Sequence, residues 1–536
     1  MLLTIFIISL LIFGVAYKIY GKILTKKYEI SDKNLTPSHT MQDNIDYVPS
    51  KAIVLFGHHF SSIAGAGPIV GPILAALSFG WLPALLWIII GSIFIGGVHD
   101  FSSVVASIRN KGRSIAEIAK QYLGNFPYKM FLLFIWLSLV YVLIVFLDLT
   151  ANTFVKSGAT ATSSIIYIFL AILFGLSIYR ARLNFIFSTI VFVLLVFLAL
   201  VIGNIYPLKF SPFIFNSAVK TASLILLIYI FLASILPVWF LLQPRDYLAS
   251  FLLYSSVIVG AIGIIFGGFK INYPAFTKFN VDGNTLFPLL FVTIACGAIS
   301  GFHSLVASGT TSKQLDKESD AIKIGYGGML MEGIVAVISL STLMMLSKNS
   351  KISNEAQIIY GKGIANFASL LKIKPEIGMN FGILVLSTFL LTTLDTATRL
   401  GRYIWQEIFN WNIKRTRIQT TIITIMLPTI FAFITLRDQN GNPIPAWKVI
   451  WPIFGASNQL LAALTLLVIS LWVAKLKKNN LFLLIPAIFM IIVTLTALAI
   501  LILKYKFTVV GIIGIILFIL AIYLMVLTFR KIRTEN

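Results

Sequence analysis

The sequence predicts an all-α polytopic membrane protein with about 15 transmembrane helices. Of its 536 residues, 58% are hydrophobic and only 11% are charged, and the mean hydropathy is +0.94. This composition is typical of a chain that crosses a membrane many times, and not of a soluble domain with one anchor. The predicted spans lie at about 2–20, 52–79, 81–108, 129–153, 161–179, 183–203, 221–242, 247–267, 287–307, 322–346, 379–398, 419–436, 448–473, 481–502 and 508–528.

The charge of the loops supports this number of spans and indicates an orientation. If the loop after the first span is cytoplasmic and the sides then alternate, the cytoplasmic loops hold 28 of the 42 Lys and Arg residues. Cytoplasmic loops normally carry such an excess, and a missed helix in mid-chain would blur it. We therefore expect the N-terminus outside and the C-terminus in the cytoplasm.

The composition also excludes several classes of protein. The net charge is +23, but the basic residues are spread through the loops and no basic run is interleaved with aromatic residues, so no nucleic-acid partner is expected. A single cysteine, Cys296, excludes an intramolecular disulfide and a multi-cysteine metal site. Residues 1–20 lack a basic start and are followed by lysines, which favours a retained first helix over a secretory signal.

The most unusual stretch is Phe56–Pro72, within the second predicted span. It holds two histidines, two serines, three glycines within seven residues and two prolines. Proline removes a backbone donor, and a membrane helix can leave its backbone unpaired only where it is buried in protein or lines a wet cavity. We therefore expect a broken helix near 65–71, whose freed backbone groups meet substrate and ions. The alternative is a proline kink that serves only packing.

A similar stretch occurs in the ninth predicted span. Gly297–Gly301 repeats the small-xxx-small spacing of Gly67–Gly71, again beside a histidine. The two spans are seven helices apart and run in opposite directions, as an inverted repeat requires. We expect a second interruption near 297–301. The alternative is that this spacing marks only close helix packing.

Titratable residues inside spans are few, and each costs free energy unless it is paired or wet. Four of the five histidines belong to this group. The complete set is His58, His59, His99, Asp100, Asp148, His303, Glu332 and Asp395.

Some of these residues allow more than one reading. His99 and Asp100 suit a proton relay, but a buried pair that fixes helix packing and, with less support from spacing, a metal site are alternatives. Glu332 could couple ion movement or pair with a neighbouring helix. Asp395 and Arg399 have the i,i+4 spacing of an ion pair on one helix face, with Asp395 the deeper of the two.

Several motifs resemble those of the carbon starvation protein A (CstA) family. They are Phe56-Gly57-His58-His59-Phe60 through Pro72, Leu242-Gln243-Pro244-Arg245-Asp246-Tyr247, Phe302-His303-Ser304 through Thr311, Leu394-Asp395-Thr396-Ala397-Thr398-Arg399 and Trp451-Pro452 through Leu460.

This resemblance implies an inner-membrane carrier of the amino acid–polyamine–organocation superfamily, with a LeuT-like inverted repeat of five plus five helices. It implies import of peptides during carbon starvation, or of pyruvate with protons in some members. The chain then divides into a first transmembrane helix and cytoplasmic loop (1–51), a transporter core and two C-terminal transmembrane helices (474–536). The core at 52–473 comprises repeat one at about 52–203, two linking helices at about 221–267 and repeat two at about 287–473.

We expect a secondary active transporter driven by an ion gradient, because the sequence has no Walker A motif. Protons are the expected coupling ion, with sodium open, and no cofactor or metal is expected. A membrane-embedded enzyme would need a motif such as HExxH or GxSxG, which the sequence lacks. A nutrient sensor with a transporter-like core is a further alternative.

The substrate, peptide or pyruvate, is expected to carry a carboxylate. No Lys or Arg is expected deep inside a span, so this carboxylate should dock on the backbone N–H groups where the broken helix resumes, at about 66–70. The residues expected to couple ions are His59, His99, Asp100 and Glu332. The residues expected to bind substrate are His58, His59, Ser62, Gly65, Ala66, Gly67, Ile69, Val70, His303 and Asp395.

Overall fold

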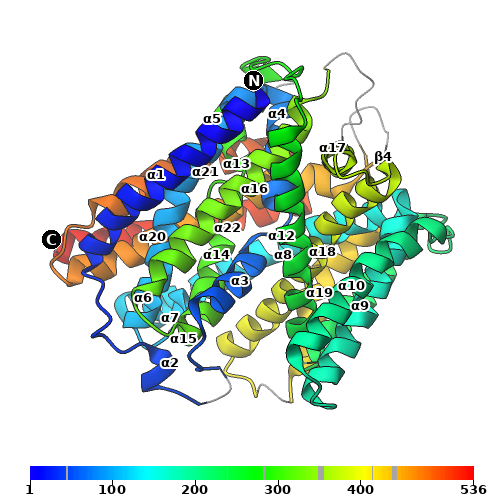
Figure 1. Ribbon diagram of the computed structural model, residues 1–536. Helices are drawn as coiled ribbons and strands as arrows, with labels where there is room; N and C mark the ends of the chain where they lie inside the picture. Colours follow the sequence, from blue (N-terminus) through cyan, green and yellow to red (C-terminus); the bar gives the residue numbers. More distant parts are fainter. Residues whose placement is uncertain are drawn as a thin grey trace. The chain divides into compact units, whose positions relative to one another are not determined.

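The computed structural model is helical almost throughout, and its few strands form short two-residue hairpins (Figure 1). Helices dominate because a membrane offers no water to satisfy backbone N–H and C=O groups. The chain divides into two compact units, which are described separately below. The structure describes residues 1–43, 46–237, 240–281, 284–347, 355–412, 415–437, 443–506 and 508–535.

All fifteen predicted apolar runs coincide with helices of the described residues. Twelve helices are long and apolar enough to cross a membrane, and Ala52–Ile63 with Gly67–Phe79 forms one further, bent span. The other two runs are shorter helices, Arg417–Phe433 and the pair Leu286–Thr293 and Gly301–Val306. The expectation of an all-α polytopic membrane protein is therefore confirmed, while the figure of 15 spans is approximate.

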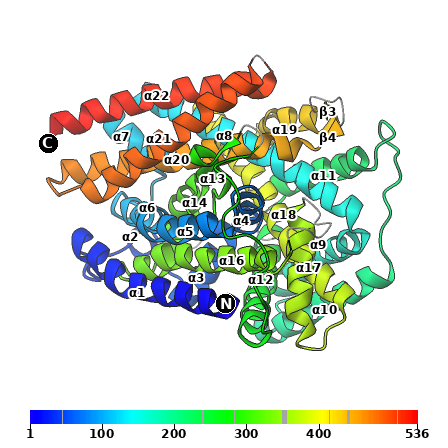
Figure 2. The same ribbon diagram turned by 90° about the horizontal axis from the view of Figure 1, so that it is seen from above.

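The first unit contains both helix interruptions and is called the broken-helix unit. It comprises residues 4–138, 273–340 and 452–536. The C-terminal helices α21 and α22 lie side by side in it (Figure 2). Its elements are α1 (Leu2–Tyr28), α2 (Pro37–Thr40), α3 (Ala52–Ile63), α4 (Gly67–Phe79), α5 (Trp81–Gly91), the π-helical turn η1 (Ser92–Gly96), α6 (Gly97–Arg109), α7 (Ile115–Leu123), β1 (Asn280–Val281), β2 (Asn284–Thr285), α13 (Leu286–Thr293), α14 (Gly301–Val306), η2 (Ala307–Thr311), α15 (Ser312–Gln314), η3 (Ile322–Tyr326), α16 (Gly327–Met344), α20 (Ala446–Lys475), α21 (Leu481–Tyr505) and α22 (Val509–Glu535).

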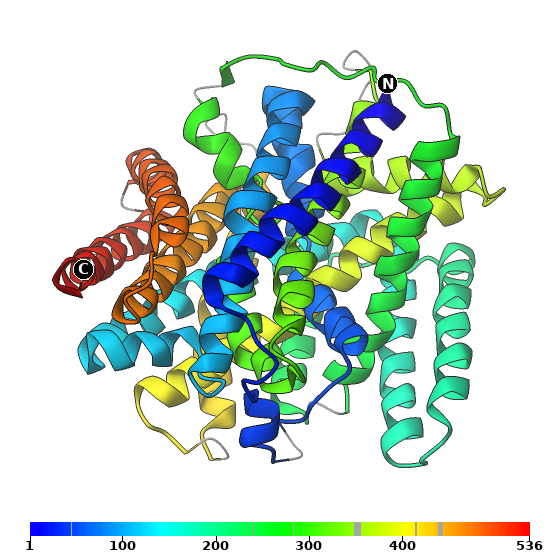
Figure 3. The ribbon, with the colours of Figure 1, turned by 60° about the vertical axis from the view of Figure 1, so that its left-hand side comes forward.

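The second unit, the straight-helix unit, comprises residues 1–3, 139–272 and 341–451. Helices α1, α8, α16 and α20 have residues in both units. Within the straight-helix unit, α9 and α10 form an antiparallel pair (Figure 3). Its elements are α8 (Asn125–Lys156), α9 (Gly158–Tyr179), α10 (Phe185–Ile205), α11 (Ala218–Ile235), α12 (Leu242–Phe266), α17 (Ala356–Ser369), α18 (Pro375–Ile408), α19 (Arg417–Phe433), β3 (Leu436–Arg437) and β4 (Pro443–Ile444).

A buried amide joins three helices of the straight-helix unit. Asn380 of α18 accepts a hydrogen bond from Thr160 of α9 at 2.9 Å and donates to the Leu200 carbonyl of α10 at 3.1 Å. Because a buried amide is costly unless its donors and acceptor are satisfied, these bonds fix the register of the three helices.

The first interruption lies between α3 and α4, which are bent by 44°. The non-helical residues are 64–66, and α4 begins at Gly67 with Pro68 in its first turn. Proline is well tolerated there, because the first N–H groups of a helix have no partner within it. The predicted break near 65–71 is confirmed, although it ends earlier than expected since residues 67–71 are already helical.

The second interruption separates α13 from α14 and comprises residues 294–300. The predicted break near 297–301 is thus confirmed and is longer than expected. Its freed carbonyls have partners: Ser92 donates to the Gly297 carbonyl at 3.1 Å, and Gln459 donates to the Ile294 carbonyl at 3.3 Å. The break is buried in protein, as a membrane chain requires.

The span that follows each broken span has a similar design. Each contains a π-helical turn, η1 or η3, followed by an α-helix that begins with glycine, Gly97 or Gly327. Each of these α-helices carries one buried carboxylate, Asp100 in α6 and Glu332 in α16. Because π-helical turns occur frequently at functional sites, the turns η1 and η3 indicate that these two carboxylates are candidate functional groups.

Candidate functional site: a buried histidine–carboxylate cluster

His303 links the two carboxylates. Its Nδ1 lies 2.8 Å from Oδ2 of Asp100, and its Nε2 lies 3.2 Å from Oε2 of Glu332. All three side chains are fully buried. They come from α14, α6 and α16, so the helix that follows the second break meets the two spans that contain η1 and η3. We refer to His303, Asp100 and Glu332 as the His303 cluster.

The geometry of this cluster limits the protonation states in which its contacts are favourable. A neutral imidazole has one N–H donor and one lone pair, so only one of its nitrogens can donate to a carboxylate. Both nitrogens of His303 face carboxylate oxygens, but Nε2 and the two Glu332 oxygens form no hydrogen bond with any described residue. Protonation of the ring or of a carboxyl group would make both contacts attractive, so the cluster contains groups that can hold a buried proton.

His99 extends the His303 cluster. Its Nδ1 lies 2.7 Å from Oδ1 of Asp100, so Asp100 is held between two imidazoles. The other nitrogen of His99, Nε2, is buried without a hydrogen-bond partner among the described residues. The predicted His99–Asp100 pairing is confirmed by this contact, although the coupling role assigned to it is not tested.

The start of α14, which carries His303, is held by a second set of hydrogen bonds. Asn458 of α20 accepts from the Phe302 backbone N–H at 3.0 Å and donates to the Ser300 hydroxyl at 2.9 Å. One side chain thus satisfies a free N–H of the helix start and fixes the end of the break.

His59 lies on α3, just before the first break. Its Nδ1 lies 2.8 Å from the Thr311 hydroxyl, and its ring packs against Gly328, where a Cβ would lie 3.2 Å from the ring. The neighbouring His58 is partly buried, and its carbonyl accepts from the Ser62 hydroxyl at 2.8 Å. Ser62 is therefore bonded back to its own helix.

The backbone predicted to receive a carboxylate is tightly enclosed. Ala66, Ile69 and Val70 are fully buried, and a Cβ added to Gly67 would lie 2.5 Å from Cβ and Sγ of Cys296. Gly65, in the break, donates its N–H to the Ile63 carbonyl at 2.7 Å. The residues of the second break thus cover the start of α4 in this structure.

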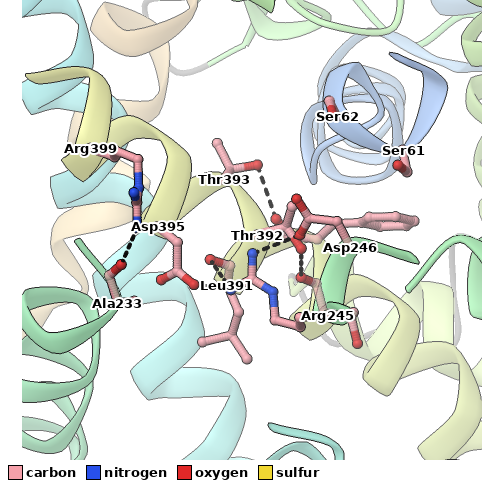
Figure 4. A network of polar contacts seen from close by, with 12 residues as sticks. Ser61, Ser62, Ala233, Arg245, Asp246, Leu391, Thr392, Thr393, Asp395 and Arg399 are labelled. Carbon is pink, nitrogen blue, oxygen red and sulfur yellow. Dashed lines mark hydrogen bonds and ion pairs between the residues drawn. The ribbon is translucent and has the colours of Figure 1, made fainter. Parts of the chain in front are cut away.

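Asp395 lies in the straight-helix unit and is paired there. The Tyr229 hydroxyl donates to Oδ2 of Asp395 at 2.8 Å, and Nη1 of Arg245 pairs with the same oxygen. Nη2 of Arg245 contacts Asp246 at 2.8 Å. We refer to Arg245, Asp395, Asp246 and Tyr229 as the Arg245 cluster; Figure 4 shows Arg245 beside Asp246.

Two sequence-based expectations are wrong here. Arg245 lies between two predicted spans, but it is fully buried in the first turn of α12. Arg399 does not pair with Asp395; it donates to the carbonyls of Ala233 at 2.7 Å and Leu236 at 2.8 Å (Figure 4). The carbonyls at the C-terminus of α11 lack helical partners and accept from Arg399, while Asp395 is already paired with Arg245.

Sequence reasoning missed Arg245 because it was assigned to a turn between two spans. A signal was present: Pro244 precedes a long apolar run, and proline early in such a run is typical of a helix start. Thr311 and Tyr229 gave no comparable signal. Asp148, which had no expected partner, accepts from the Trp447 backbone N–H at 2.9 Å.

The described residues contain no group of three or more His, Cys, Asp or Glu side chains arranged to hold a metal ion. Asp100 and Asp395 instead have imidazole and guanidinium partners, respectively.

The family model described as "Carbon starvation protein CstA" matches residues 1–373 and 352–497. The chain belongs to the CstA family. It is 32% identical over 90% of its length to the peptide transporter CstA of Campylobacter jejuni, of which the match covers 78%. It is 29% identical over 92% of its length to the pyruvate/proton symporter BtsT of Escherichia coli, of which it covers 81%.

Among solved structures, a mutant form of a manganese transporter of Eremococcus coleocola matches with a TM-score of 0.50 and 13% identity, over 94% of this chain and 100% of that chain. At this identity the likeness shows the fold alone. The expected LeuT-like architecture is confirmed at that level.

Proposed function

We propose that this protein is a secondary active transporter that imports peptides and couples their uptake to protons. The single observation that carries the proposal is His303, whose two ring nitrogens face two buried carboxylates at the end of a broken helix. The membership of the CstA family and the printed function of the Campylobacter relative support peptides as the substrate.

The proton would be held in the His303 cluster and passed between its members. His303 sits two residues after the start of α14, so any movement of the second break moves it relative to Asp100 and Glu332. Separating buried opposite charges is costly, and a proton shift that neutralises them lowers this cost. Break movement and proton binding are thereby coupled. His59 and His99 are the proposed next members of the relay.

The substrate carboxylate would dock on the N–H groups at the start of α4, around residues 66–70. A helix start carries partial positive charge and free donors. Since Cys296 covers Gly67 in this structure, docking requires the two breaks to move apart. His58, Ser62, Gly65, Ile69 and Val70 are the proposed surroundings. The proposed acceptor for a peptide amino group is Asp100 or Asp395, of which Asp395 would first have to part from Arg245.

Pyruvate is the alternative substrate, favoured by the similarity to BtsT, whose printed name is pyruvate/proton symporter. A nutrient sensor is a remote alternative. We also propose that the chain is not an enzyme, that it belongs to the amino acid–polyamine–organocation superfamily, and that it resides in a bacterial inner membrane with the N-terminus outside.

Transport in liposomes tests the proposal. The purified protein is reconstituted and supplied with a panel of radiolabelled peptides and with pyruvate, with and without a pH gradient. We expect accumulation only with an inward proton gradient. Asp100→Asn should remove this accumulation while leaving substrate counterflow, because exchange needs no net proton movement. Accumulation driven equally well by a sodium gradient alone would contradict proton coupling.

A further inference from the structure

We propose that the C-terminal end of α18 and the start of α19 form a binding site for a phosphate-bearing anion. The site comprises Arg399 and Arg402 of α18 and Arg417 of α19. Two sources share this chemistry, namely the headgroup of an anionic phospholipid and free phosphate.

The three arginines are gathered around one place. Arg399 and Arg402 are three residues apart on α18 and so share a helix face. Arg399 donates to the α11 carbonyls of Ala233 and Leu236, and Arg417 donates to the Ile235 carbonyl between them at 2.9 Å. Arg399 and Arg417 are also close enough to act electrostatically on Arg402.

Arg402 has donors that nothing in the described chain uses. The residue is 2% exposed, and its Nε and Nη1 have no hydrogen-bond partner. The Tyr403 ring lies over the guanidinium, whose carbon Cζ is 4.6 Å from the ring centroid. A buried guanidinium with unused donors is costly, and an oxyanion beside Nε or beside Nη1 would satisfy one of them.

The positive charge is not balanced locally. The C-terminus of α11 supplies about half a negative charge, against three guanidinium groups. No carboxylate of the described residues forms an ion pair with any of the three. The undescribed residues that follow α11 and precede α19 in sequence are Val238, Trp239, Ile413 and Lys414, none of which is acidic.

The surroundings suit the depth of lipid headgroups. Trp405 and Phe409 stack with ring centroids 5.3 Å apart, and Phe409 stacks on Trp411 at 5.1 Å. Phe409 and Trp411 are exposed on the surface. Aromatic residues of this kind mark the membrane–water interface, where phosphate groups of lipids lie.

The unfolding temperature of the full-length protein tests the site. One arm compares nanodiscs of phosphatidylcholine with nanodiscs that also contain phosphatidylglycerol. The other adds inorganic phosphate to the detergent-purified protein, against chloride at equal ionic strength. We expect the wild type to be stabilised by phosphatidylglycerol, and Arg402→Gln to weaken this binding by about tenfold or more. Arg415→Gln removes one exposed charge from the same loop and should respond like the wild type.

The two arms of the experiment distinguish a lipid headgroup from free phosphate. Stabilisation by phosphatidylglycerol alone assigns the site to a lipid headgroup, and stabilisation by both assigns it to the phosphate group itself. A wild type that responds to neither, or an Arg402→Gln variant that responds like the wild type, overturns the proposal. If Arg402→Gln does not fold, Arg402→Lys keeps the charge without the planar fork. Weaker binding by that variant then supports the site, and unchanged binding overturns it. Because the unfolding temperature reports binding of the anion and not transport, the result does not depend on the proposed transport function.

Discussion

The His303 cluster and the Arg245 cluster differ in what their charges can do. The His303 cluster contains groups that exchange protons, with two carboxylates facing one imidazole. The Arg245 cluster contains a guanidinium, which stays charged at any physiological pH. It pairs with Asp395 and Asp246 and is supported by the Tyr229 hydroxyl. The first can therefore change its net charge while buried, whereas the second can only break or remake a pair.

Because of this difference, we expect the two clusters to have different roles. A buried pair of permanent charges is costly to open, so the Arg245 cluster should hold α12 and α18 together. A cluster whose charge varies with bound protons can lower the cost of its own rearrangement. The comparison therefore predicts that damage to the Arg245 cluster lowers stability, and damage to the His303 cluster lowers coupling.

The largest expected effect follows from Arg245→Met. It leaves Asp395 fully buried without its cation, which should cost about 3–5 kcal/mol of unfolding free energy. Chemical or thermal unfolding of the purified protein measures this. The double variant Arg245→Met/Asp395→Asn removes both charges and should recover most of the loss. Asp246→Asn, at the more exposed edge of the same cluster, should cost less than about 1 kcal/mol. Equal losses in the two single variants would show that the buried pair has no special role.

The next effect concerns coupling. His303→Gln keeps a polar side chain but cannot carry the exchangeable proton. Accumulation driven by a pH gradient should fall by about 100-fold, while counterflow and the unfolding temperature stay close to wild type. The matched control is His39→Gln, which removes the exposed histidine outside the cluster and should change nothing in uptake. If His303→Gln still concentrates substrate, the proton is carried by other groups.

The helices and both breaks could be predicted from the sequence because their signals are local. An apolar run predicts a span, and clustered Gly and Pro predict an interruption, whatever the rest of the chain does. Buried titratable residues inside the predicted spans, such as Asp100, His303 and Glu332, were also found from sequence, because charge inside an apolar run is conspicuous. Arg245, Arg402 and Glu318 are equally buried and were missed. His99 and Asp100 were adjacent and could be paired directly.

Long-range partners could not be predicted in the same way. Asp100 and His303 are 203 positions apart, and Arg245 and Asp395 are 150 apart. Nothing local relates them, and the nearest local partner for Asp395, Arg399, is engaged by the carbonyls of α11. Only the folded helices show that Arg245 is buried and paired.

The variant with the smallest expected effect, Gly67→Ala, tests whether the geometry of the His303 cluster depends on the close approach of the two breaks. In Gly67→Ala the new Cβ would lie 2.5 Å from Cβ and Sγ of Cys296, so the second break must shift. We expect a loss of about 1–3 kcal/mol in unfolding free energy. Gly14→Ala in α1 is the control, because nothing lies within 4 Å of its added Cβ, and it should be neutral or slightly stabilising.

The shift should also be visible in transport, since α14 begins five residues after Cys296 and carries His303. Gly67→Ala should therefore lower proton-driven accumulation more than counterflow, as a milder form of His303→Gln. Cys296→Gly removes the obstructing Cβ, so the double variant should recover both stability and accumulation. The Arg245 cluster belongs to the other unit and should not respond. If Gly67→Ala loses stability but keeps full coupling, the breaks pack together without setting the geometry of His303, and the proposed link between break movement and proton binding fails.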